Sequence, residues 1–65
     1  MDRPEAATDV QWDQACKVAD PVCVIFFADG GRADGLRVYY RRAGQLRFRC
    51  VNSEGQVTTD RKSHI

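Results

Sequence analysis

The chain has 65 residues, of which 43% are hydrophobic and 29% are charged, so it suits one small globular domain and is too apolar for a disordered segment. Ten Lys and Arg residues against nine Asp and Glu residues leave a formal net charge of +1, which by itself predicts no preference for nucleic acid or for a membrane surface. Any binding preference must come from the distribution of the charges.

Targeting signals and cysteine usage both indicate the compartment. No apolar run approaches the roughly 18 residues that a membrane span needs, and the N-terminal MDRPEAATD is acidic and polar where a secretory signal would be basic and then apolar. Cys16, Cys23 and Cys50 are odd in number and form no Cys-x-x-Cys motif. We therefore expect a cytoplasmic protein with buried free thiols, without a disulfide framework and without a zinc site.

The N-terminal part of the chain predicts one short helix. Residues 1–7 show no periodic pattern, so we expect a disordered lead-in, followed by a single domain over residues 8–65. Thr8 and Gln11 have the spacing of a capping box, which predicts a helix over about residues 8–19 that ends before a proline. The core-facing side of this helix would carry Trp12, Cys16 and Ala19, with Ala15 beside them.

The rest of the chain predicts strands. The first, VCVIFFA, is apolar throughout, which is typical of a strand covered on both faces. Asp29-Gly30 suits a tight hairpin turn, and Gly35 interrupts the next strand where a bend needs a residue without Cβ. The predicted fold is mainly β (small α+β), an N-terminal helix followed by a bent, antiparallel four- to five-stranded barrel or sheet. Its strands are expected at about residues 22–28, 32–41, 45–51 and 56–60, with a short strand or a frayed tail at 62–65.

The second and third predicted strands alternate between apolar residues and residues that are basic or aromatic. Keeping the apolar residues of both strands on one face requires a three-residue loop over residues 42–44. This register would set Tyr39 opposite Arg47 and Arg37 opposite Arg49. The predicted apolar face carries Leu36, Val38, Tyr40, Leu46, Phe48 and Cys50.

The other face of these two strands is the predicted binding site. Arginines that lie directly opposite each other repel, and an anionic partner would relieve the repulsion. An aromatic ring beside guanidinium groups is also the arrangement on which unpaired bases stack. The alternative is a solvated face whose arginines pair with Asp34, Glu54 or Asp60. The residues predicted to bind single-stranded RNA are Arg37, Tyr39, Arg41, Arg47 and Arg49.

The order of elements resembles the Sm-like small barrel of the Sm, LSm and Hfq proteins. The likeness rests on ADGGRADGLRVYYRR and the preceding helix, and the tail KSHI resembles the Lys-His segment of the bacterial Hfq branch. The segment RRAGQLRF lacks the Asp-x-x-x-Asn signature of the eukaryotic and archaeal Sm proteins, so their RNA pocket is not carried over. Because no full fifth strand is evident, we expect a monomer or a weak dimer and not a ring.

The same plan is similar to the Rof-type inhibitors of the Rho transcription terminator, which have an N-terminal helix, act as monomers and bind protein through an acidic surface. This resemblance implies an alternative function, a small regulatory protein that binds a protein partner such as a transcription termination factor. Asp9 and Asp13 on the predicted helix would carry that contact.

Neither catalysis nor a cofactor is expected. The Ser and Thr residues have no visible base or orienting partner. His64 has no second ligand at metal-site spacing, and Gly30-Gly31 lacks the Lys-Ser/Thr of a phosphate loop. We therefore predict a non-catalytic binding module without a metal.

Overall fold

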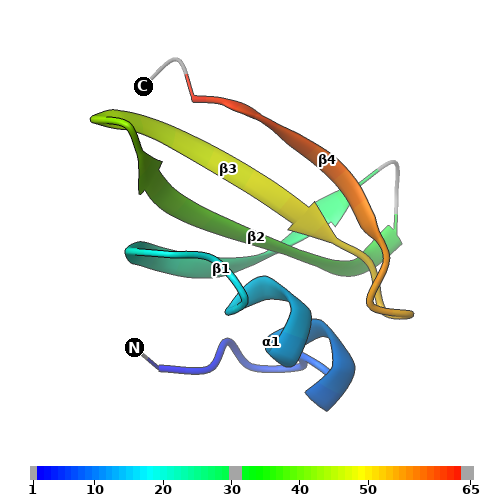
Figure 1. Ribbon diagram of the computed structural model, residues 1–65. Helices are drawn as coiled ribbons and strands as arrows, with labels where there is room; N and C mark the ends of the chain where they lie inside the picture. The colour runs from blue at the N-terminus through cyan, green and yellow to red at the C-terminus, as the bar shows by residue number, and fades with distance from the viewer. Residues whose placement is uncertain (1, 30–31, 64–65) are drawn as a thin grey trace.

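The computed structural model describes residues 2–29 and 32–63, which form one helix followed by four antiparallel strands. Within these residues the strands make one open, strongly twisted sheet in the order β1-β2-β3-β4 (Figure 1). The predicted fold class, mainly β with an N-terminal helix, is confirmed. The elements are α1 (Asp9–Ala15), β1 (Pro21–Asp29), β2 (Arg32–Arg42), β3 (Gln45–Val51) and β4 (Val57–Lys62).

The helix α1 begins where the capping box predicts. The Thr8 Oγ1 accepts a hydrogen bond from the Gln11 N–H at 3.1 Å, and the Gln11 Oε1 accepts one from the Thr8 N–H at 2.9 Å. The helix ends at Ala15 and not at Ala19, because the Lys17 N–H bonds the carbonyl of Gln14 in a tighter turn. With seven residues α1 is too short to cross a membrane, and no other helix occurs in the described parts of the chain.

The buried side of α1 is only in part the predicted one. Gln11 and Ala15 are 1% and 0% exposed, whereas Trp12 is half-buried. The capping bond holds the Gln11 side chain at the start of the helix, and a polar residue therefore occupies a core position. Of the predicted core face, Ala15 is confirmed, whereas Trp12 and Cys16 are only half-buried and Ala19 is exposed, so the buried side is rotated toward Gln11.

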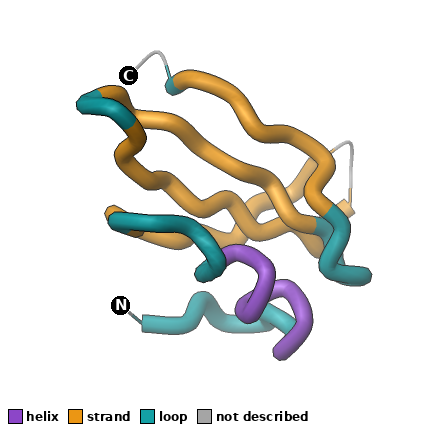
Figure 2. Tube along the Cα trace, in the orientation of Figure 1, coloured by secondary structure: helices purple, strands orange, loops and turns teal. Residues whose placement is uncertain are grey.

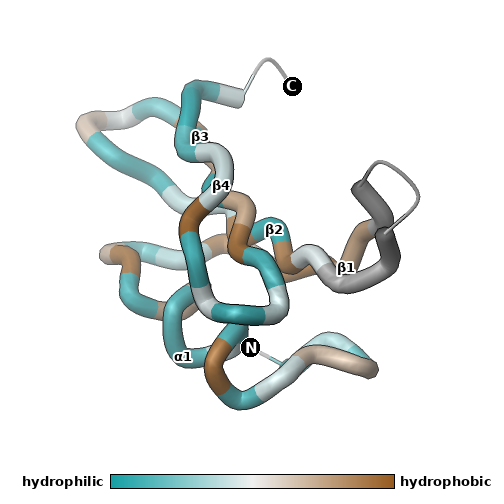
Figure 3. The backbone as a smooth tube through the Cα atoms, turned by 90° about the vertical axis from the view of Figure 1, so that its right-hand side faces the viewer, coloured by the Kyte–Doolittle hydropathy of each residue, from teal (hydrophilic) through white to brown (hydrophobic). Residues whose placement is uncertain are grey.

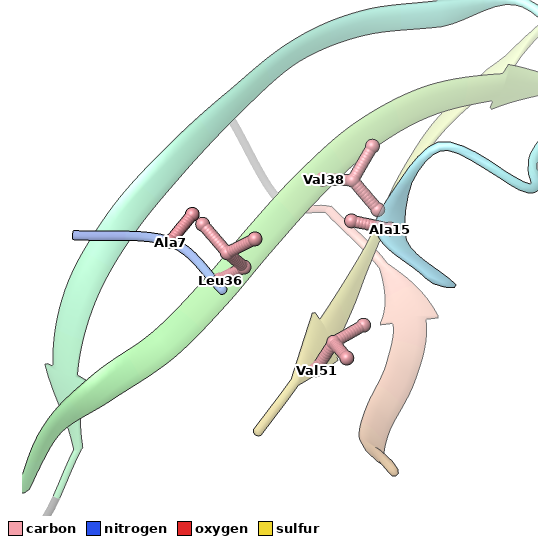
Figure 4. Packing of buried hydrophobic residues seen from close by; sticks show 5 residues of the cluster. All are labelled: Ala7, Ala15, Leu36, Val38 and Val51. Carbon is pink, nitrogen blue, oxygen red and sulfur yellow. The ribbon is translucent and has the colours of Figure 1, made fainter. Parts of the chain in front are cut away.

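The core lies between α1 and one face of the sheet. Ala7, Ala15, Leu36, Val38 and Val51 form a buried cluster there (Figure 4). Figure 2 shows α1 on one side of the strands only. We call the helix side the covered face of the sheet and the other side the open face.

Strand β1 is an edge strand that is covered on one face only. Val24 and Phe26 pack against the core, but Val22 and Ile25 are 47% and 43% exposed. The expectation that both faces would be covered is therefore wrong, because residues 2–29 and 32–63 supply a single short helix. The predicted turn at Asp29-Gly30 falls partly outside the described residues.

The hairpin between β2 and β3 has a two-residue turn where a three-residue loop was predicted. Ala43 and Gly44 have φ values of 52° and 78°, and Arg42 pairs with Gln45. This is the left-handed geometry of a type I′ turn, which glycine adopts easily and alanine rarely. The register is shifted by one residue from the predicted one, so Tyr39 lies opposite Phe48 and Tyr40 opposite Arg47.

Strand β4 follows a compact turn. The Asn52 Oδ1 accepts hydrogen bonds from the backbone N–H groups of Glu54 and Gln56 at 3.0 and 2.9 Å. Val57 then pairs with Val51 but stays 48% exposed. Part of the predicted fifth strand, Lys62, belongs to β4, and residues 64–65 lie outside the described residues.

Candidate nucleic-acid interface

The five residues predicted to bind RNA do not share one face. Residues that are directly opposite in neighbouring strands point to the same side of a sheet. Arg37 pairs with Cys50 and Arg41 with Leu46, whereas Val38 pairs with Arg49 and Tyr40 with Arg47. Arg47 and Arg49 therefore lie on the covered face, and Arg37, Tyr39 and Arg41 lie on the open face. The predicted pairs Tyr39–Arg47 and Arg37–Arg49 are wrong, because the turn contains one residue fewer.

On the covered face, Arg47 and Arg49 converge on Asp60 of β4. The Arg49 Nη2 and Nε donate to the Asp60 Oδ2 at 2.9 and 3.1 Å, and the Arg47 Nη2 lies 3.8 Å from the Oδ1. The Tyr40 hydroxyl donates to the same Oδ1 at 2.5 Å. The three charged side chains are only 25–29% exposed. This cluster fits the alternative interpretation, in which arginines pair with Asp60.

Asp60 keeps its charge in this cluster. Partial burial acts to raise the pKa of its carboxyl group, but the hydrogen bonds from Tyr40 and Arg49 and the positive charges of Arg49 and Arg47 outweigh it. The net effect lowers the pKa of Asp60 below its ordinary value of 3.8. A charged Asp60 offsets much of the positive charge of Arg47 and Arg49, so these two have less to offer an anionic ligand.

On the open face, rings and guanidinium groups alternate across all four strands. The Arg37 Cζ lies 4.8 Å from the centre of the Phe27 ring and 4.9 Å from the centre of the Phe48 ring. The Arg61 Cζ lies 5.5 Å from the centre of the same Phe48 ring. These distances are within the range of cation–π interactions. We call Phe27, Arg37, Phe48 and Arg61 the stacked row.

Gly35 makes the first contact of the stacked row possible. It pairs with Phe27 of β1, and a Cβ at Gly35 would lie 2.8 Å from the Phe27 ring. The ring can lie across β2 and reach Arg37 only because this residue has no side chain. The sequence predicted a bend at Gly35, and in the structure the group that needs the space of the absent Cβ is the aromatic ring of Phe27.

Tyr39 extends the stacked row. Its ring centre lies 5.8 Å from that of Phe48 with a 44° tilt, and its hydroxyl accepts a hydrogen bond from the Arg37 Nη1 at 3.3 Å. That bond is the main reason that the pKa of the Arg37 guanidinium is raised above its ordinary value, so the charge is permanent. The Arg37 Nε is buried and has no hydrogen-bond partner among the described residues.

The open face combines the two kinds of group that single-stranded nucleic acids contact. Its rings are half-buried, so part of each is accessible. Arg37, Arg41 and Arg61 supply positive charge, and no described side chain that the register places on this face is acidic. Along the chain, short hydrophobic segments alternate with hydrophilic ones (Figure 3). Bases can stack on rings and guanidinium planes, and phosphates can pair with the arginines.

The sequence prediction missed three residues of this surface, namely Phe27, Phe48 and Arg61. Phe48 was assigned to the core because the predicted register placed it with Leu36 and Val38. The signal that could have found it is the short turn, since a two-residue loop places Phe48 opposite Tyr39. Phe27 and Arg61 lie in strands whose facing follows from that same register.

The remaining sequence candidates lie elsewhere. Asp9 forms an ion pair with Arg3 at 2.5 Å, and Asp13 is exposed on α1. All three cysteines are free, but only Cys50 is buried, while Cys16 is half-buried and Cys23 exposed. The described residues contain no group of three His, Cys, Asp or Glu side chains that could hold a metal, and His64 lies outside them.

A comparison with known protein-family models, with curated proteins and with solved structures finds no match for this chain.

Proposed function

We propose that this protein is a non-catalytic, cytoplasmic module that binds single-stranded RNA on the open face of its sheet. The observation that carries the proposal is the stacked row, in which each of the four strands contributes one ring or one guanidinium group at 4.8–5.5 Å from its neighbour. The proposed contact residues are Phe27, Arg37, Tyr39, Arg41, Phe48 and Arg61.

The geometry favours single strands over duplexes. Bases stacked inside a duplex hide their faces, and a row of planar groups has nothing to stack on there. A single strand can turn its bases toward the rings while Arg41 or Arg61 contacts the phosphates. The resemblance in order of elements to Sm-like proteins is consistent with this function and does not carry it.

The two alternatives have less support. A purely solvated face accounts for the ion pairs of Arg47 and Arg49, but Arg37, Arg41 and Arg61 form no ion pair with any described residue. A protein partner at the acidic helix would meet Asp9 already paired with Arg3, which leaves Asp13 as the exposed acid of that pair.

Two adjacent residues of β4 provide a matched test. Arg61 lies opposite Phe48 on the open face, and the neighbouring Lys62 lies opposite Arg47 on the covered face. Both are exposed, and each change to Gln removes one positive charge. Fluorescence anisotropy with a labelled single-stranded RNA, measured over a series of salt concentrations, should show weaker binding for Arg61→Gln. Its salt slope should fall by about one unit, and Lys62→Gln should bind like the wild type.

A second variant tests stacking apart from charge. Phe48→Leu keeps an apolar side chain but removes the ring, so it should weaken RNA binding by about 1–3 kcal/mol with little change in the salt slope. Circular dichroism verifies that the variant is folded. If the wild-type protein shows no saturable binding at low salt, or if Arg61→Gln and Lys62→Gln lose equal affinity, the open face is not an RNA site.

A further inference from the structure

A second basic site lies apart from the stacked row, where the loop after α1 runs beside the end of β2 (Figure 1). There the chain surrounds a hollow of about 260 Å³. Lys17 contributes from the loop, Tyr40 and Arg42 from β2, and Arg49 from β3, and the backbone at Arg41 completes the wall. Of the lining residues, Lys17, Arg42 and Arg49 carry positive charge on this side of the sheet, whereas Arg41 points to the open face, and no lining residue is acidic.

The loop that carries Lys17 is held in place at two points. Val18 packs against the buried cluster of the core. The carbonyl of Asp20, a residue with φ of 55°, accepts a hydrogen bond from the Arg41 N–H at 3.3 Å. Because a non-glycine residue rarely adopts this φ, the surrounding structure maintains the loop conformation. The hollow is therefore largely formed before any ligand arrives.

The positive charge around the hollow is mostly uncompensated. Lys17 and Arg42 take part in no ion pair with any other described residue. Arg49 is paired with Asp60, which belongs to the covered face and does not line the hollow. Like charges gathered in a partly enclosed site repel one another, and an anion that fits among them removes this repulsion.

The ligand that suits these groups is a compact dianion. Planar guanidinium groups bind phosphate oxygens through paired hydrogen bonds, and a lysine adds a point charge. A phosphate monoester carries about −1.5 to −2 charges at neutral pH, whereas a carboxylate or a phosphodiester inside a strand carries one. We propose that this hollow binds a phosphate monoester group, supplied either by the terminal phosphate of a nucleic-acid strand or by a small phosphorylated molecule.

The test compares two double variants of equal charge. Lys17→Gln with Arg42→Gln removes two cations from the hollow, and Arg3→Gln with Lys62→Gln removes two that lie outside both the hollow and the stacked row. Chemical-shift titrations with inorganic phosphate, at an ionic strength matched with chloride, should show saturable shifts of the backbone amides around residues 17–20 and 40–42. The first double variant should weaken binding at least about tenfold, because each charge-assisted hydrogen bond is worth about that factor. The second should leave it unchanged.

Two further arms identify the source of the phosphate. If a strand supplies it, an oligonucleotide with a 5′-phosphate should bind more tightly than the same oligonucleotide with a 5′-hydroxyl, and the difference should vanish in the Lys17→Gln, Arg42→Gln variant. If a small molecule supplies it, adenosine monophosphate should bind like inorganic phosphate while the oligonucleotide's end group has no effect.

The proposal is overturned if neither phosphate nor a phosphorylated ligand shifts these amides, or if binding survives in the Lys17→Gln, Arg42→Gln variant. Since the probe is inorganic phosphate, these outcomes do not depend on whether the open face binds RNA.

Discussion

The two faces of the sheet use arginine in opposite ways. On the covered face, Arg49 directs its Nε and Nη2 to the single carboxylate of Asp60. On the open face, Arg37 and Arg61 lie over aromatic rings with no carboxylate among their described neighbours. The difference originates in β4, where Asp60 and Arg61 are adjacent and so point to opposite sides.

The comparison separates arginines that stabilise the fold from arginines that can bind a ligand. A guanidinium group paired with a carboxylate has most of its charge offset and its donors occupied. A guanidinium group stacked on a ring keeps its charge, and those of its N–H groups that are exposed and unbonded can still donate to a ligand. Four predictions test this division, from the largest expected effect to the smallest.

Substitution of one leucine on each face compares how much the two faces contribute to stability. Leu36 is fully buried on the covered face, and Leu46 is half-buried on the open face. Leu36→Ala should lower the free energy of unfolding by about 2–5 kcal/mol, and Leu46→Ala by clearly less, because less apolar contact is lost. Urea denaturation followed by circular dichroism measures both. Equal losses would mean that the open face is as much a core as the covered one.

The Asp60 cluster should make the free energy of unfolding depend on pH in the acidic range. Because its folded pKa is lowered, Asp60 stabilises the fold fully above its unfolded pKa of about 3.9, and this contribution is lost as the pH falls below that value. Asp60→Asn should cost about 1.5–3 kcal/mol at neutral pH and flatten the decline in acid. Thermal melts over a pH series, with the exposed Asp13→Asn as the control, measure this. An unchanged acid decline in Asp60→Asn would contradict it.

Gly35→Ala tests the geometry of the stacked row. The new Cβ would lie 2.8 Å from the Phe27 ring, so the ring must move away from Arg37. We expect a loss of about 1–3 kcal/mol in urea melts, typical of overpacking. Adding Phe27→Leu should restore part of the stability by removing the ring that clashes. If the double variant is no more stable than Gly35→Ala, the ring is not the group that requires the glycine.

Removal of the helix cap at Thr8 should have the smallest effect on stability. It concerns only the covered face, against which α1 packs. Thr8→Ala removes the acceptor of the Gln11 N–H and should cost about 1 kcal/mol, whereas Thr8→Ser should keep most of the stability. Denaturation followed by the fluorescence of Trp12 reports on α1 directly. RNA affinity should be the same in both variants while they are folded. A loss of affinity in Thr8→Ala alone would show that the helix contributes to the interface.

Features set by local chemistry were predictable from the sequence. The Thr8–Gln11 capping box fixes the start of α1. Segments in which apolar residues alternate with basic or aromatic ones, bounded by glycines, locate β2 and β3 to within about one residue. The burial of Gln11 was not predictable, because its polar side chain enters the core only through the bond that caps the helix.

The composition of the interface depended on one backbone angle. The alternation of apolar with basic or aromatic residues in β2 and β3 is compatible with two registers of strand pairing. The length of the turn determines which register forms. Ala43 adopts a φ of 52°, which its residue type does not indicate, and this shortens the loop to two residues. That single conformation moves Phe48 from the expected core to the open face and moves Arg47 and Arg49 the other way.

The position of Asp60 in β4, after the β2–β3 hairpin in the chain, also affects how these elements fold during synthesis. Arg47 and Arg49 leave the ribosome before the carboxylate that neutralises them, and they lie on the covered face beside Tyr40. A nascent chain that ends before β4 would have to place two uncompensated guanidinium groups beside its core. The hairpin of β2 and β3 therefore lacks its neutralising carboxylate until Asp60 has been translated, and the helix, the hairpin and β4 should become stable together once β4 has emerged.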